Sequence, residues 1–287
     1  MAVKYEKFYS WIVLLGILLA VSLLMVGSLR AQEKIMDLET SAGRLRITAI
    51  GHGSLMFEFG DVLIHVDPYS RAGDYANLPK ADQIWITHAH PDHLDLVAID
   101  QIKKEGTLFV ADPESAEKLG DSGVIVMQNW DKRDIDGIAM EAQYDSLSGA
   151  TPFGGFEIIP VIPDKRDIDG ITIEAVPAYN LVREREPGVK FHPKGWGNGY
   201  VATFGDKRVY IAGDTENIPE MAYLGLIDVA FIPIDGRYTM SPEEAVGCIK
   251  VISPKVVIPY HQGQSDPNVI AELLKGSSIE VRVLPLP

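Results

Sequence analysis

The sequence predicts a mixed α/β domain, and three observations support this class. Short apolar or alternating stretches typical of strands recur from residue 44 onward, and stretches with helical spacing separate several of them. Glycine, proline and aspartate stand between these segments at turn positions. The chain has 287 residues, 46% of them hydrophobic, so it can bury a core of the size that a layered fold needs.

The first 31 residues differ from the rest of the chain. Lys4 and Lys7 precede an uncharged apolar run of 19 residues, Trp11 to Leu29. A run of this length is about long enough to span a bilayer, and lysines before it predict that this end stays in the cytoplasm. We therefore expect residues 1–31 to be a signal peptide or an N-terminal membrane anchor. A polar linker at 32–43 and an extracytoplasmic domain at 44–287 would follow.

The predicted elements of the first half surround a cluster of histidines. An alternating strand begins at Arg44, and two more strands follow around a Gly60-Asp61 turn. The next strand, 81–90, ends in the stretch "THAHPDH". A helix at 94–104, a strand at 107–112 and a short helix at 113–120 come after it, the last with proline at its start and glycine at its end.

The second half continues the alternation of strands and helices. A hairpin is expected around Gly205-Asp206, and a helix capped by Ser241 follows a buried strand. A further strand ends in His261. The segments in order are 199–215 for the hairpin, 227–234 for a strand, 241–252 for a helix, 254–261 for a strand, 266–276 for a helix and 279–285 for a strand.

An internal repeat lies between the two halves. "DKRDIDGIAMEA" begins at Asp131 and "DKRDIDGITIEA" begins at Asp164, 33 residues later, and ten of the twelve positions match. Two copies are too few for a solenoid. Each copy contains Asp-Gly before an alternating strand, which predicts a hairpin, and its acidic spacing differs from that of an EF-hand. We interpret residues 131–163 as a duplicated hairpin segment that decorates the domain.

Charge and cysteine content exclude several kinds of site. The formal net charge of −14 argues against non-specific binding to nucleic acid, so no nucleic-acid partner is expected. The single cysteine, Cys248, excludes an intrachain disulfide and a cysteine-rich zinc cluster. Any metal site must therefore use histidines and carboxylates.

The stretch from His88 to His93 concentrates such groups. His88, His90, Asp92 and His93 follow a hydrophobic strand within six positions. Imidazole and carboxylate are good ligands for divalent ions such as zinc. One ion does not easily use all four groups of so short a segment, so the pattern predicts two adjacent ions, about 3.5–4 Å apart as in two-metal hydrolases.

The H-x-H-x-D-H motif resembles the signature of the metallo-β-lactamase superfamily. "VDP" at 66–68, "AGDT" at 212–215 and "IPYH" at 258–261 follow in the family's order, so the resemblance covers most of 45–287. "GHGS" at 51–54 and "DVAFIPIDGRYTMSPEEA" further resemble the branch that contains the L-ascorbate 6-phosphate lactonase and the N-acylphosphatidylethanolamine phospholipase D. The resemblance implies a four-layer αββα sandwich with its site at one edge of the paired sheets.

The resemblance also implies roles for single residues. His88 and His90 would bind the first metal. The second metal would be held by Asp92, His93 and His261, and Asp214 would bridge both metals. Asp67 would lie behind the ligands and orient the histidine loop.

The chain departs from the family at the third histidine of the first metal. That place reads "VPAYN", with Tyr179 and Asn180, and His192 comes twelve residues beyond Asn180. We predict that His192 replaces the missing ligand; a substrate donor acting with Lys194, or a structural histidine, are the alternatives. His52 and Lys194 are predicted to contact substrate, whereas His65, inside an apolar strand, is expected to pack or to support the site.

These features predict a hydrolase in which a metal-bound hydroxide, oriented by Asp92, cleaves an ester, lactone or phosphodiester bond. Two divalent ions are expected, zinc first and manganese as the alternative. The substrate would be a small-molecule or lipid-like ester or phosphoester. The N-terminal segment would tether the protein to a membrane. Two other classes stay open: a non-catalytic metal-binding domain, and a single-iron dioxygenase on the same scaffold. The identity of the bound metal would discriminate them.

Overall fold

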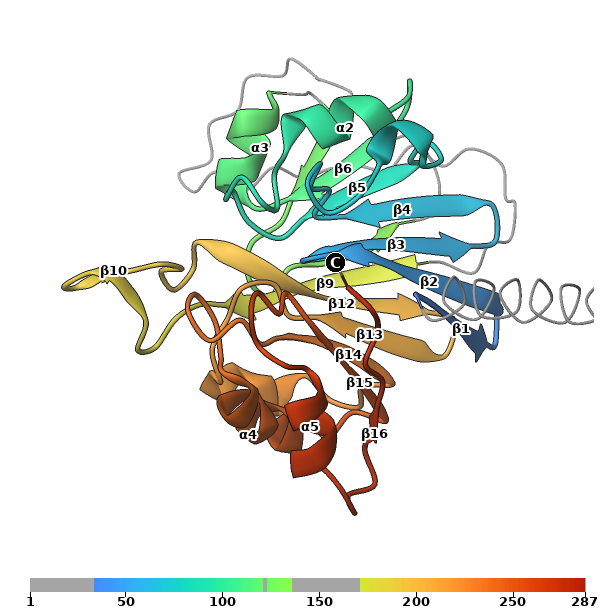
Figure 1. Ribbon diagram of the computed structural model, residues 1–287. Coiled ribbons are helices and arrows are strands. Elements are labelled where there is room, and N and C mark those ends of the chain that lie inside the picture. The colour runs from blue at the N-terminus through green and yellow to red at the C-terminus, as the bar shows by residue number, and fades with distance from the viewer. Residues whose placement is uncertain (1–33, 121–122, 136–170, 287) are drawn as a thin grey trace, which may run out of the picture.

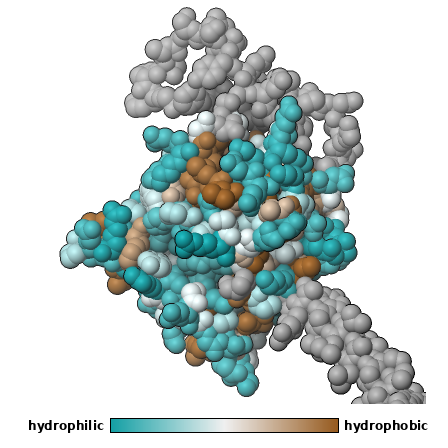
Figure 2. Space-filling model, turned by 45° about the horizontal axis from the view of Figure 1, so that its top comes forward, coloured by the Kyte–Doolittle hydropathy of each residue, from teal (hydrophilic) through white to brown (hydrophobic). Residues whose placement is uncertain are grey.

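Two seven-stranded sheets pack face to face in the computed structural model, which describes residues 34–120, 123–135 and 171–286. Helices lie on the outer face of each sheet (Figure 1). The fold is therefore the predicted mixed α/β sandwich with the layer order αββα. The face seen in Figure 2 is mostly hydrophilic, with apolar side chains gathered in small patches.

The first sheet joins an antiparallel meander to a parallel half. Its strands in spatial order are β1 (Ile35–Thr40), β2 (Gly43–Gly51), β3 (Ser54–Phe59), β4 (Val62–Val66), β5 (Gln83–Ile86), β6 (Leu108–Ala111) and β7 (Val124–Val126). Neighbours from β1 to β4 are antiparallel, and those from β4 to β7 are parallel. The crossovers carry η1 (Tyr75–Asn77), α2 (Leu96–Ile102) and α3 (Pro113–Leu119). Asp95 and Asp112 cap α2 and α3 through their carboxylates.

β1 corrects the prediction of a linker at 32–43. Met36 and Leu38 alternate with polar residues, and they pair with Ile47 and Leu45 of β2. Because Met36 is buried against the core, this short alternation is sufficient to add an edge strand.

The second sheet has the same mixed construction. Its strands in spatial order are β16 (Glu280–Val281), β15 (Val256–Tyr260), β14 (Val229–Pro233), β13 (Lys207–Ile211), β12 (Gly197–Phe204), β9 (Ile171–Ala178) and β8 (Lys132–Ile135). Helices η2 (Pro219–Tyr223), α4 (Pro242–Ile252) and α5 (Asn268–Leu273) belong to this half, and α4 begins with a capping box formed by Ser241 and Glu244. A small hairpin of β10 (Glu184–Glu186) and β11 (Val189–Lys190) projects beyond both sheets (Figure 1).

The core between the sheets is rich in aromatic side chains. Phe57 and Trp85 of the first sheet meet Phe204 and Phe231 of the second, with Phe57 and Phe204 edge to face at 5.7 Å. All four side chains are fully buried. Each such side chain contributes roughly 1.5–3 kcal/mol by burial, which holds the two sheets in a fixed relation. The strand ends of both sheets therefore have fixed relative positions.

The repeat contributes one strand from each copy to the second sheet, and the turn residues of both predicted hairpins lie outside the described residues. β8 belongs to the first copy and pairs antiparallel with β9 of the second copy, Lys132 opposite Glu174 and Ile135 opposite Ile171. Most of the segment interpreted as decoration, residues 136–163, lies outside the described residues. The observed ladder therefore joins one half of each copy.

The predicted extracytoplasmic, membrane-anchored or secreted location is corrected. Residues 1–31, which motivated it, lie outside the part of the chain that the structure describes. Within the described part, no helix is long and apolar enough to cross a membrane. The longest helix there, α4, has 11 residues and extends about 16 Å, against a hydrocarbon thickness of about 30 Å. On this finding the predicted location is wrong.

Candidate metal centre

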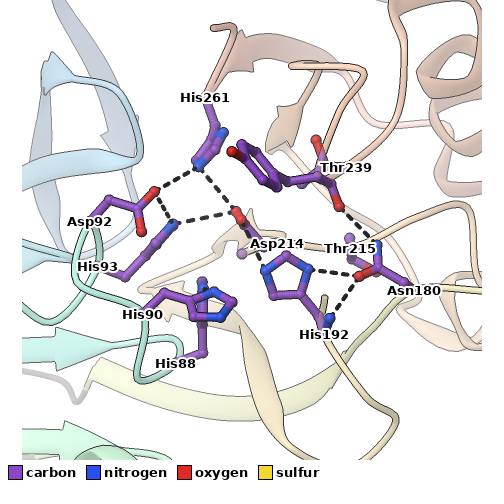
Figure 3. Close-up of polar contacts among 12 residues, drawn as sticks. His88, His90, Asp92, His93, Asn180, His192, Asp214, Thr215, Thr239 and His261 are labelled. Carbon is purple, nitrogen blue, oxygen red and sulfur yellow. Dashed lines mark hydrogen bonds and ion pairs between the residues drawn. The ribbon is translucent and has the colours of Figure 1, made fainter. Parts of the chain in front are cut away.

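The predicted ligands gather at one edge of the sandwich, where strands of both sheets end (Figure 3). Parallel strands place their carboxyl ends at a common edge, which is where open α/β sheets bind ligands. In chain order, Asp67 follows β4, the stretch His88 to His93 follows β5, His192 precedes β12, Asp214 follows β13 and His261 follows β15.

Three imidazoles form a first group, here called the first position. His88 Nε2 lies 3.1 Å from His90 Nδ1. The ring of His192 lies 5.1 Å from that of His88 and 4.9 Å from that of His90, centroid to centroid. One nitrogen from each of the three falls within 4.8 Å of the others. His192 thus lies beside His88 and His90, as expected for the predicted replacement ligand.

Asp92, His93 and His261 form a second group, here called the second position. Asp92 Oδ2 lies 3.9 Å from His93 Nε2 and 3.7 Å from His261 Nε2. His52 joins this group, since its Nε2 is 2.9 Å from the same Asp92 oxygen. His52 therefore lies next to the candidate ligands rather than only at the rim of the site.

Asp214 lies between the two positions. Its Oδ1 is 3.4 Å from both His93 Nε2 and His261 Nε2, and its Oδ2 is 3.3 Å from His192 Nε2 (Figure 3). Each carboxylate oxygen thus faces a different group of nitrogens. This is the geometry that a bridging carboxylate requires.

Asp67 and Thr87 fix the rings that follow β5. Asp67 Oδ2 accepts from His93 Nδ1 at 2.8 Å and from the Thr87 hydroxyl at 2.6 Å. Thr87 Oγ1 in turn lies 3.0 Å from His88 Nδ1, which donates to it. Because both Nδ1 atoms are engaged in these bonds, the two Nε2 atoms face the centre as the candidate ligand atoms. Thr87 was missed from the sequence.

Asn180 holds the ring of His192, and Asp235 lies beside that of His261. Asn180 Oδ1 accepts from the backbone N–H of His192 at 2.7 Å and from its Nδ1 at 2.8 Å. Asp235 Oδ2 lies 3.1 Å from His261 Nδ1. Neither residue was predicted, although each follows a buried strand (β9 or β14), as the predicted ligands do.

Two glycines allow the backbone to approach the ligands. A Cβ atom on Gly53 would lie 3.0 Å from His93 Cε1 and 3.5 Å from His261 Cδ2. A Cβ atom on Gly197 would lie 2.9 Å from His88 Cβ. Larger residues at these places would push the rings out of their present positions.

Burial and charge divide the histidines into two kinds. Burial, reinforced by neighbouring imidazoles, lowers the pKa of His90 to about 4 and that of His88 well below its usual value. Burial also opposes charge on His93, but the Asp214 and Asp67 carboxylates outweigh it and raise the pKa of His93 to about 9. His88 and His90 thus favour the neutral imidazole, whereas the carboxylates beside His93 favour its protonated form.

Several buried atoms at the centre have no hydrogen-bond partner among the described residues. They are His93 Nε2, His192 Nε2, Asp214 Oδ1 and both ring nitrogens of His261. Leaving a buried polar atom unpaired costs about 1–3 kcal/mol, so such a cluster needs an explanation. Nitrogen and carboxylate donors that converge without partners fit divalent cations.

The remaining candidates lie apart from this cluster. Lys194 Nζ pairs with Glu220 Oε1 at 2.6 Å and lies 3.3 Å from the Tyr179 hydroxyl, so the structure does not bring it to the ligands. His65 is buried in β4 with its Nε2 3.1 Å from the carbonyl of Pro79, which is the packed role expected for it.

Comparison with known proteins gives concordant matches. Residues 46–261 match the family described as the β-lactamase superfamily domain. A UPF0173 metal-dependent hydrolase from Methanopyrus kandleri is 28% identical over 252 residues, covering 84% of this chain and 96% of the relative. A solved structure from Parabacteroides distasonis, provisionally described as a metal-dependent hydrolase, is 38% identical with a TM-score of 0.72 and covers 88% of this chain and 99% of that chain. The metallo hydrolase Igni18 from Ignicoccus hospitalis is 27% identical with a TM-score of 0.59. The match covers 84% of this chain and 94% of that chain.

Proposed function

The chain belongs to the metallo-β-lactamase superfamily of metal-dependent hydrolases, and from this premise we propose that it is a binuclear enzyme that hydrolyses an ester, lactone or phosphodiester. The observation that carries the proposal is Asp214, whose two oxygens face different groups of donor atoms. His88, His90 and His192 would hold the first ion. Asp92, His93 and His261 would hold the second, and Asp214 would contact both.

Two zinc ions held by these residues, with manganese as the alternative, would supply Lewis acidity and a bound water of lowered pKa. Asp92 would orient the attacking water. Its side chain is 35% exposed, whereas that of Asp214 is 3% exposed, so Asp92 is the candidate carboxylate ligand most open to solvent. Burial opposes its ionisation, but His261 and His52 hold the pKa of Asp92 well below its usual value. Asp92 therefore acts as a hydrogen-bond acceptor for that water.

We propose a small-molecule or lipid-like substrate with an apolar group. Leu181 and Val182 directly follow Asn180, and they are 44% and 74% exposed. Exposed apolar side chains beside a polar site favour ligands that combine a reactive polar group with an apolar part. The narrower resemblance to the lactonase and phospholipase D branch stays a prediction.

The test combines metal content with a substrate panel. The purified chain is assayed by elemental mass spectrometry and with p-nitrophenyl esters, lactones and bis(p-nitrophenyl) phosphate. We expect the wild-type chain to bind two equivalents of zinc or manganese. Its hydrolytic activity should disappear on chelation and return when metal is added. Asp214→Asn should lose both the metal and the hydrolytic activity. Asp100→Asn, which alters an exposed carboxylate on α2, is the matched control and should behave as wild type.

Two outcomes would overturn the proposal. A single iron equivalent with oxygen-dependent turnover would assign the chain to the single-iron dioxygenases. Metal binding without turnover of any ester, lactone or phosphodiester would favour a non-catalytic metal-binding domain.

A further inference from the structure

We propose that His52 is a positioning residue that holds Asp92 and His261 at the second position, rather than a residue that contacts substrate. The inference rests on the proposed binuclear site and adds a residue to its support. His52 lies directly after β2, in the first sheet. It is one of five non-glycine residues with positive φ in the described part of the chain, with φ of 53°. Such a backbone is strained for a residue that carries a side chain, and it persists where surrounding contacts require it.

The backbone conformation of His52 supports His261. The carbonyl oxygen of His52 accepts a hydrogen bond from the backbone N–H of His261 at 3.0 Å. The two rings lie 3.8 Å apart, centroid to centroid, with their planes tilted by 43°. Because His261 follows β15 of the second sheet, this contact links the two sheets directly beside the second position.

The side chain of His52 supports Asp92. Its Nε2 lies 2.9 Å from Asp92 Oδ2, the same oxygen that lies 3.7 Å from His261 Nε2. A hydrogen bond donated by Nε2–H fixes the rotation of the carboxylate and keeps this oxygen facing the other ligands. A single residue therefore holds one ligand from each sheet.

The second position needs this contact because Asp92 has no other holder. His93 is held by Asp67, and His261 has Asp235 at its Nδ1. Outside the candidate ligands, His52 is the only hydrogen-bond partner of the Asp92 carboxylate among the described residues. With 35% of its side chain exposed, Asp92 would otherwise be free to rotate toward water.

The experiment measures each metal equivalent separately in wild type, His52→Ala and His52→Gln. Metal-free protein is titrated with Co²⁺, followed by absorption, and bound metal is counted by elemental mass spectrometry after equilibrium dialysis. Wild type should bind two equivalents. His52→Ala should bind the second about 10–100-fold more weakly with the first unchanged, the usual effect of losing a residue that orients a ligand. His52→Gln, whose amide can donate to the same oxygen, should recover most of the loss.

Other outcomes would contradict the inference in distinguishable ways. If His52→Ala keeps both affinities and only raises KM, His52 contacts substrate. If His52→Gln is as weak as His52→Ala and both show a changed cobalt spectrum, His52 is itself a ligand. If wild type never binds two equivalents, the binuclear function fails and the inference fails with it. Circular dichroism of the metal-free proteins checks that the variants fold.

Discussion

Deleting residues 136–168 should stabilise the protein and leave the metal centre intact. Ile135 of β8 and Ile171 of β9 are paired at the end of their ladder, with residues 136–170 connecting them. Because of the repeat, the deletion joins Ile135 to Asp169 and gives the sequence "DKRDIDGITIEA". Asp169-Gly170 would then close the same pair with a two-residue turn of the type that hairpins favour.

The size of the effect follows from the length of the connection. The entropic cost of closing a loop grows as about (3/2)RT ln n, so shortening it from 35 residues to two is worth about 2.5 kcal/mol at 25 °C. For a protein of this size, that gain corresponds to a rise in Tm of about 4–5 °C. The metal content should stay unchanged, since none of the predicted ligands lies in the deleted segment.

The assay is urea unfolding of the metal-free proteins, with the free energy of unfolding compared between the full chain and the deletion. The matched control is the same deletion carrying Gly170→Val. The turn needs positive φ at its second residue, so the control should lose much of the gain. A deletion variant no more stable than the full chain, or a control equal to the deletion, would refute the reasoning.

Three further predictions concern the site and its surroundings. Replacing His192 by alanine should lower the metal content from two equivalents to about one, measured by elemental mass spectrometry, because the first position loses one of its three imidazoles. Burial lowers the pKa of His65 to about 4, so the unfolded chain takes up the proton first and stability falls as pH drops from about 6.5 to about 4. Between pH 7 and pH 4.5, the free energy of unfolding should therefore fall by up to about 3 kcal/mol less in His65→Leu than in wild type. Urea unfolding of both proteins at the two pH values measures this difference. Gly53→Ala should weaken the second position about tenfold in zinc dialysis, because its Cβ would lie 3.0 Å from His93 Cε1.

Each of these predictions has a clear contrary result. Two equivalents retained in His192→Ala would make His192 a structural histidine. An acid dependence in His65→Leu equal to that of wild type would show that another group controls it. Unaltered zinc affinity in Gly53→Ala would mean that the ring of His93 can move aside at no cost.

The strand ends that carry the ligands could be read from the sequence, whereas the residues that hold the ligands could not. Asp214 and His261 follow apolar strands inside recognisable motifs, so their gathering at one edge follows from the sheet rules. Thr87, Asn180 and Asp235 also follow buried strands. Which ring each one contacts depends on how the two sheets are placed against each other. Local patterns carry no information on that placement.

The pairing of β8 with β9 shows a second limit of local patterns. Each copy of the repeat has its own Asp-Gly turn signal, and both copies begin with the same "DKRDI". A turn rule applied to either copy alone predicts a hairpin within it. The sheet order places β9 between β12 and β8, so the "DKRDI" segment that pairs with β9 is the one in the first copy. Identical segments compete equally for one edge, and the sequence does not rank them.

The displaced histidine has a structural explanation. The chain leaves the site at Asn180 and returns at His192, and the two residues bond to each other through Asn180 N–H to the His192 carbonyl at 2.8 Å as well as through the amide side chain. The hairpin of β10 and β11 occupies the sequence between them. Asn180, which stands where the resemblance implies a ligand, thus holds the histidine that we propose as its replacement.

The base of this hairpin is fixed by the same loop that supplies Asp214. Glu216, two residues after Asp214, accepts from the backbone N–H groups of residues 181, 182 and 183 at 2.8, 2.7 and 2.9 Å. Its side chain is 5% exposed, so these bonds are shielded from water. The first position and the hairpin base therefore form one rigid unit. Substitutions at the tip of the hairpin should therefore leave Asn180 and His192 in place.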